Sequence, residues 1–122
     1  QAGNLVMATA TKGLVVPSTT VTQDAGALTN GVTINATAGK ITLAAVALAA
    51  TTNAEFTVTN NTVGTSSIIL ITLEDKNTTD NVQLSATINT IASGSFKISI
   101  VNPHSSVASS ATASKIHYLV VN

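Results

Sequence analysis

The amino-acid sequence predicts an all-β domain, an antiparallel β-sandwich or jelly-roll-like fold of about eight short strands. Three observations predict it. Aromatic residues are 2% and charged residues 8% of the chain, so the apolar content comes mainly from Ala, Val, Ile and Leu, of which Val and Ile favour strands. Apolar and polar residues alternate in short segments. Clusters of Gly, Asn, Asp and Ser separate these segments, as turns separate strands.

The first half of the chain contains four predicted strands. Gly26 and Asn30 mark the turn after the first, and Asn60 and Gly64 mark the turn after the fourth. The Ala-rich residues 44–50 have helix propensity, but the segment is short, uncapped and flanked by Thr, so we expect no helix there. The predicted strands are 19–23, 31–35, 40–46 and 55–59, and the last of these places Phe56 and Val58 on one face.

The second half contains four more predicted strands. Residues 68–73 are apolar on both faces, which predicts a central strand covered above and below, in the middle of the core. The other three alternate strictly, and their apolar faces are predicted to be buried. They are 82–88 (Val82, Leu84, Ala86, Ile88), 96–100 (Phe96, Ile98, Ile100) and 115–121 (Ile116, Tyr118, Val120).

The 122 residues are enough for one two-layer core, so we expect a single sandwich domain over residues 19–122. Residues 1–18 do not alternate strictly. Their scattered apolar side chains predict an N-terminal arm or linker that packs on a neighbouring subunit. These side chains are Leu5, Val6, Leu14, Val15 and Val16.

Composition argues against several classes of partner. Five basic and five acidic residues cancel, which leaves no basic stripe for nucleic acid. The longest apolar stretches, 43–50 and 68–71, are far shorter than a membrane helix of roughly 20 residues. There is no Cys, hence no disulfide and no thiolate ligand or nucleophile. We therefore expect no nucleic-acid partner and no membrane partner.

The residue types that catalysis requires are few and scattered, which predicts that the protein is not an enzyme. His104 and His117 are the only imidazoles, and we interpret both as structural. No Gly-x-Ser-x-Gly elbow is present, and the many Ser residues are interpreted as surface and turn residues. Gly64 and Gly94 stand alone, outside any phosphate-binding pattern. We predict no catalytic residue, no metal ligand, no cofactor-binding residue and no cofactor.

Two weaker patterns involve the polar loops. Residues 75–81 offer oxygen ligands at the spacing a calcium ion could use, but they lack the EF-hand Gly and Glu, so a solvated hairpin loop is the favoured interpretation. Asn-x-Ser/Thr sequons at Asn35, Asn60 and Asn77 are frequent by chance in a chain rich in Thr and Asn.

Several longer stretches, in this order and spacing, resemble a β-rich module of structural proteins of tailed bacteriophages, particularly marine and cyanobacterial ones. The resemblance extends from Val21 to Asn122, and residues 1–18 and 105–114 depart from it. The stretches are VTQ at 21–23, GVTINATAGKIT at 31–42, FTVTNNTV at 56–63, IASGSFKISIVN at 91–102 and the closing IHYLVVN.

The resemblance implies a virion structural protein and brings no catalytic residues with it. Such a module is expected on the virion surface, as part of a capsid decoration, head fibre or tail fibre, and as a symmetric homo-oligomer, with a trimer expected. Its partners would be further copies of itself and the major capsid protein or other virion proteins. The leading hypothesis is a module that decorates or cements the capsid.

Two alternatives stay open. The chain could be a tail-fibre or receptor-binding module whose loops at 60–66 and 74–81 contact the host. It could instead be a subunit of a cellular surface filament in which the apolar arm completes the sheet of a neighbour by strand addition.

Overall fold

The computed structural model describes residues 16–79 and 81–122, and this part of the chain contains eight strands and no helix. The all-β prediction is confirmed. No element of the described part could cross a membrane as a helix. The strands are β1 (Thr19–Thr22), β2 (Val32–Thr33), β3 (Ala38–Thr42), β4 (Asn53–Thr59), β5 (Ile68–Glu74), β6 (Ser85–Ala92), β7 (Ser95–Val101) and β8 (Lys115–Val121).

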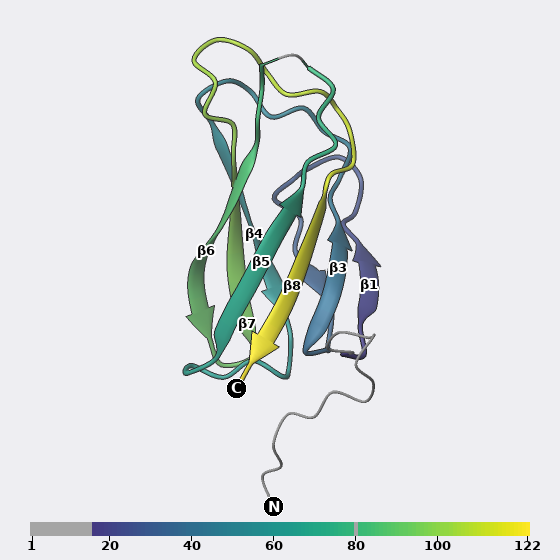
Figure 1. Ribbon diagram of the computed structural model, residues 1–122, viewed down its shortest axis with the longest axis vertical. Coiled ribbons are helices and arrows are strands. Elements are labelled where there is room, and N and C mark those ends of the chain that lie inside the picture. The colour runs from purple at the N-terminus through teal and green to yellow at the C-terminus, as the bar shows by residue number, and fades with distance from the viewer. Residues whose placement is uncertain (1–15, 80) are drawn as a thin grey trace, which may run out of the picture.

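The strands form two four-stranded sheets, as in a β-sandwich (Figure 1). Sheet A has the order β1-β3-β8-β5 and sheet B the order β2-β4-β7-β6. Most neighbouring strands are antiparallel as predicted, but β1 pairs with β3, and β2 with β4, in parallel. From β1 to β4 the chain passes to the other sheet after every strand. A chain that crosses to the other sheet and comes back has reversed its direction twice, so β3 runs parallel to β1 and β4 parallel to β2. The sandwich is therefore mixed.

The core lies between the sheets and is filled by the alternating apolar side chains. Phe56 of β4, Phe96 and Ile98 of β7 and Ile116 of β8 are at most 2% exposed. The rings of Phe96 and Tyr118 join the two sheets, with centroids 5.7 Å apart at an angle of 59°. The apolar faces predicted at 56–58, 96–100 and 115–121 are confirmed as buried.

The first three strands end earlier than predicted, at Thr22, Thr33 and Thr42, and the difference is largest for the third. Residues 40–46 were expected to form one strand, whereas β3 ends at Thr42. Leu43 and Ala44 remain buried, but their backbone N–H groups donate to the Ser114 carbonyl and to Gln23 Oε1. The side chain of Gln23 thus replaces the strand partner at this point, which ends the ladder.

The prediction of a central strand at residues 68–73 is wrong. β5 is an edge strand that pairs only with β8 among the described residues. Ile69 faces the core, whereas Ile68 and Leu70 face outward and are 59% and 55% exposed. Apolar residues on both faces of a strand predict cover on both faces, and here the described part of the chain covers one face alone.

Candidate functional site

An amide residue directly follows four of the strands: Gln23 after β1, Asn60 after β4, Asn102 after β7 and Asn122 after β8. Gln23 is 2% exposed, and Asn60 and Asn102 are fully buried. A buried amide needs partners for both its N–H and its carbonyl groups. These side chains find theirs on the backbone of neighbouring loops, so they hold the loops to the strand ends.

Asn60 shows this arrangement most fully. Its Nδ2 donates to the Ala36 carbonyl at 2.8 Å and to Tyr118 Oη at 3.2 Å. Its Oδ1 accepts from the backbone N–H and the hydroxyl of Thr62, at 2.9 and 2.7 Å. Tyr118 Oη in turn donates to the Ala36 carbonyl, and burial raises the pKa of this phenol to about 12. The network ties the β2–β3 connection to β4 and β8.

Gln23 and Asn102 act in the same way elsewhere. Gln23 Nε2 donates to the carbonyls of Leu28 and Asn30, which closes the β1–β2 turn. Asn102 Nδ2 donates to the carbonyls of Leu48 and Val107, each at 2.9 Å. The sequence analysis missed these residues, although the repeated pattern of a strand followed by Gln or Asn was a signal that could have found them.

Three loops gather at one end of the sandwich, where β3, β5 and β7 end and β8 begins (Figure 1). They are residues 43–52, 75–84 and 102–114. Ser109 Oγ accepts from the Leu48 backbone N–H, and the Ser109 N–H donates to the Leu48 carbonyl. Ser110 donates from both its backbone N–H and its hydroxyl to Asn77 Oδ1. Ser109 and Ser114 are buried, which corrects their interpretation as surface residues. The three loops therefore form one connected surface.

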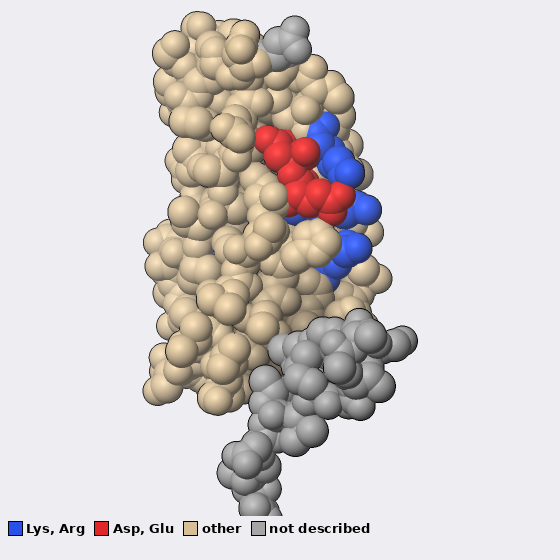
Figure 2. Space-filling model, in the orientation of Figure 1, with Lys and Arg blue, Asp and Glu red and all other residues tan. Residues whose placement is uncertain are grey.

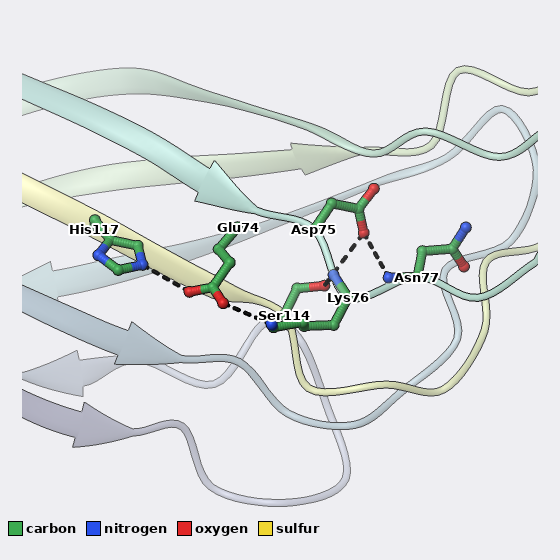
Figure 3. A network of polar contacts seen from close by, with 6 residues as sticks. All are labelled: Glu74, Asp75, Lys76, Asn77, Ser114 and His117. Atoms are coloured by element: carbon green, nitrogen blue, oxygen red, sulfur yellow. Dashed lines mark hydrogen bonds and ion pairs between the residues drawn. The ribbon is translucent and has the colours of Figure 1, made fainter.

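Loop 75–84 is ordered by its own acidic and amide residues (Figure 3). Asp75 Oδ1 accepts from the Asn77 backbone N–H at 2.8 Å and from Ser114 Oγ at 3.4 Å. Its Oδ2 accepts from the Leu84 N–H at 3.0 Å. Asn77 Nδ2 donates to the carbonyls of Thr79 and Val82. Both carboxylate oxygens of Asp75 are thus engaged in shaping the loop.

These contacts bear on the calcium interpretation of the loop. The described residues hold no cluster of three or more His, Cys, Asp or Glu that could bind a metal ion, and Asp80 lies outside the described residues. The expected hairpin is wrong, because β5 belongs to sheet A and β6 to sheet B. The loop crosses between the sheets.

Charged side chains gather on one area of the outer face of sheet A (Figure 2). The register explains this, since Lys40 of β3 lies beside His117 of β8, and Lys115 of β8 beside Glu74 of β5. Glu74 contacts His117 Nε2 at 2.9 Å and Lys76 Nζ at 2.7 Å (Figure 3). The hydrogen bonds from Lys76 and His117 lower the pKa of Glu74 to about 2. This cluster is a solvated ion-pair network with a firmly ionised carboxylate.

The other sites singled out in the sequence do not join this cluster. His104 lies in loop 102–114, and its Nδ1 accepts from the backbone N–H groups of Ser106 and Val107. Within the described residues, neither imidazole has a hydrogen bond to a hydroxyl. On sheet B, the hydrogen bonds from Asn89 and then from Lys97 lower the pKa of the Glu55 carboxyl.

The three sequons differ in accessibility. Asn60 is fully buried, and the Nδ2 atoms of Asn60 and Asn77 both donate two hydrogen bonds within the fold. Asn35 is exposed and uses its Oδ1 to accept from the Asn61 N–H. Of the three sequons, Asn35 alone has an amide nitrogen with no hydrogen bond to another described residue, as a glycan acceptor requires.

The two loops expected to contact the host do not meet. Residues 60–66 precede β5, and the described residues of 74–81 begin where β5 ends, so the two loops lie at opposite ends of the sandwich (Figure 1). The resemblance to bacteriophage modules has no counterpart in the comparisons: no protein-family model, no curated protein and no solved structure matches the chain.

Proposed function

We propose that the protein is a structural module of a bacteriophage virion, displayed on the particle surface, where it decorates or cements the capsid. The observation that carries this proposal is the use of polar groups. No buried side-chain nitrogen or oxygen among the described residues lacks a hydrogen bond, and the buried amides all hold loops to strands. Polar side chains here serve the rigidity of the fold, as an exposed building block requires.

The surface composition supports the same role. Apart from the cluster on sheet A, the face in Figure 2 is almost free of charge, and solubility comes from Thr, Ser and Asn. Such a surface has few long charged side chains to attract other macromolecules. The resemblance of residues 21–122 to phage structural modules points to the particle on which this surface is displayed. We expect further copies of the chain and the major capsid protein as partners, and a trimer as the oligomer.

Cryo-electron microscopy of the particles that carry this chain tests the proposal. Density for the sandwich over the capsid shell, at a copy number that matches capsid symmetry, is the expected result. Density confined to a tail appendage, or to a filament from cells, would contradict the capsid role.

A receptor-binding module of a tail fibre is the second candidate. The observation in its favour is the joined surface of loops 43–52, 75–84 and 102–114 at one end of the sandwich. Exposed substitutions there, such as Ser105→Lys and Ser106→Lys, should then reduce adsorption to host cells. The same substitutions should leave adsorption unchanged if the module only decorates the capsid.

A further inference from the structure

Among the described residues, the core is incompletely covered on the side where β5 and β6 lie next to each other. Six of the eight partly buried apolar side chains around the described core come from this side, and their exposed surface forms a seam between the two sheets. They are Ile71 and Leu73 of β5, Ala86, Ile88 and Ile91 of β6, and Leu84, which directly precedes β6.

The edge of β5 lacks the features that protect edge strands. It is seven residues long, has no Pro and carries no charge before Glu74. Neighbouring β6 is also an edge, but its ladder is interrupted by a bulge at Asn89. Natural proteins interrupt or charge the edges that must stay free, because an intact apolar edge is a template for a further strand. β5 is such a template.

A segment of this chain has the same order of apolar and polar residues as β5 and the residue after it. Residues 5–12 read LVMATATK and residues 68–75 read IILITLED. A parallel strand in this register would place Leu5 beside Ile68, Met7 beside Leu70, Thr9 beside Thr72 and Thr11 beside Glu74, on the outward face. Both strands would then change from apolar to polar in the same direction. Val6, Ala8 and Ala10 would face the seam, and Lys12 would lie beside Asp75.

A parallel strand is consistent with this fold, because its existing parallel pairs, β1–β3 and β2–β4, also lie at sheet edges. The chain's own arm reaches that place poorly. Thr19 is level with Ile71, four residues before Asp75, and β1 would be four strand spacings from the added strand. The separation is about 23 Å. The seven residues from Lys12 to Thr19 span about 24 Å at most when they are fully extended in a straight line. Almost no length is then left for a path over the side chains of β3 and β8.

We propose that residues 5–12 of a second copy of the chain add to β5 as a parallel strand and cover the seam between β5 and β6. The contact is head-to-tail, because each copy offers its arm to one neighbour and accepts an arm from another. Such contacts join the copies into a closed ring or an open filament. The partner is recognised by backbone hydrogen bonds along β5 and by small apolar side chains over the seam. The inference does not depend on the particle that carries the chain.

Cross-linking of the full chain tests both partner and register, because the protein has no Cys of its own. A Met7→Cys chain and a Leu70→Cys chain are mixed, oxidised with diamide and separated on a non-reducing gel. A disulfide-linked heterodimer is expected. In the proposed register Thr11 lies beside Glu74, six residues from Ile68, whereas an antiparallel strand with the same outward-facing residues would place Thr11 beside Ile68. The matched pair Thr11→Cys and Ile68→Cys should therefore form no disulfide. Cross-linking of this second pair instead of the first overturns the proposed register.

Sedimentation velocity over a range of concentrations tests the energetics. Ala8→Pro removes a backbone donor from the arm and leaves the sequence of the described domain unchanged. It should weaken self-association at least tenfold. Ala2→Pro, outside the matched segment, is the control and should associate as the unchanged chain does. A synthetic peptide of residues 1–16 should bind to the Ala8→Pro protein.

Three results would overturn the proposal. One is a chain that stays monomeric at every concentration and gives no cross-link. Another is association that Leu70→Lys abolishes and Ala8→Pro leaves intact, since two β5 edges would then pair directly. The third is a disulfide within one chain when Met7→Cys and Leu70→Cys are combined and oxidised at high dilution, because the arm would then fold back on its own domain.

Discussion

The two sides of the sandwich end in different ways. On one side β1 and β2 are only four and two residues long, and the buried amides Gln23 and Asn60 hold the connections around them. On the other side β5 and β6 are seven and eight residues long, and apolar side chains remain partly exposed between them. Short edge strands protect a sheet from further pairing. Within the described residues, one side is therefore closed by its own connections, and the other leaves apolar side chains and a long strand edge uncovered.

The largest expected effect on the free energy of unfolding comes from one of two isoleucines that pair between β6 and β7. Ile98 of β7 is fully buried, and its partner Ile88 of β6 lies at the open side. Ile98→Ala should lower the free energy of unfolding by about 4 kcal/mol and Ile88→Ala by about 2 kcal/mol, because a partly exposed side chain leaves a smaller cavity and loses less burial. Urea denaturation of dilute protein measures both. Equal losses would show that the open side is as well packed as the core.

The β-strands themselves could be predicted because alternation is local. At 96–100 and 115–121 the apolar period of two appears directly in the sequence, and the structure buries those faces. Whether a strand is central or at an edge depends on which strands pair, which is a long-range property. Residues 68–73 therefore read as central, although β5 is an edge whose outer apolar side chains Ile68 and Leu70 are exposed.

The candidate sites could be predicted less well for the same reason. The loops at 60–66 and 74–81 looked equivalent as polar connections, and only the assignment of strands to sheets places them at opposite ends. The amides at 23, 60 and 102 resemble ordinary turn residues, because the partners that bury them come from distant parts of the chain. Asn60, for example, bonds Tyr118, 58 residues away.

The closed side should depend strongly on Asn60. Asn60→Ala removes hydrogen bonds to Ala36, Thr62 and Tyr118 from a fully buried site and should lower the free energy of unfolding by about 3 kcal/mol. Asn61→Ala is the matched control, since Asn61 is exposed and bonds Asn35 through its backbone N–H, and it should change stability by less than about 0.5 kcal/mol. Thermal or urea unfolding distinguishes them, and similar midpoints would refute the role of Asn60.

Gly39 makes the closed side sensitive to a single methyl group. A Cβ at this position would lie 2.7 Å from Ile34 Cδ1, 2.8 Å from Tyr118 Cε1 and 3.0 Å from the Thr19 carbonyl oxygen. Gly39→Ala should therefore lower the free energy of unfolding by about 2 kcal/mol through overpacking. At Gly64 the nearest atom would be Ser67 Oγ at 3.9 Å, so Gly64→Ala should be nearly neutral. A neutral Gly39→Ala would show that β1 can move away from β3 at little cost.

The smallest effect should come from the ion pairs of Glu74, at the end of β5. Contacts with Lys76 and His117 lower the pKa of Glu74 from the ordinary 4.5 to about 2, so they stabilise the folded chain above pH 4.5. This stabilisation is lost as the pH falls from 4.5 towards 2, where the carboxylate takes up a proton. Glu74→Gln removes it at every pH. The difference in urea midpoint between the unchanged chain and the variant should therefore be largest above pH 4.5 and vanish near pH 2.

Salt provides the control for this last prediction. The Glu74 side chain is 36% exposed, so 1 M NaCl should reduce the difference between the two proteins at neutral pH. A difference that stays constant from pH 7 to pH 2 would mean that Glu74 acts through packing instead of charge. The charged end of β5 would then stabilise the fold by packing, as its apolar end does. The two ends of this strand would differ only in how strongly water solvates their side chains.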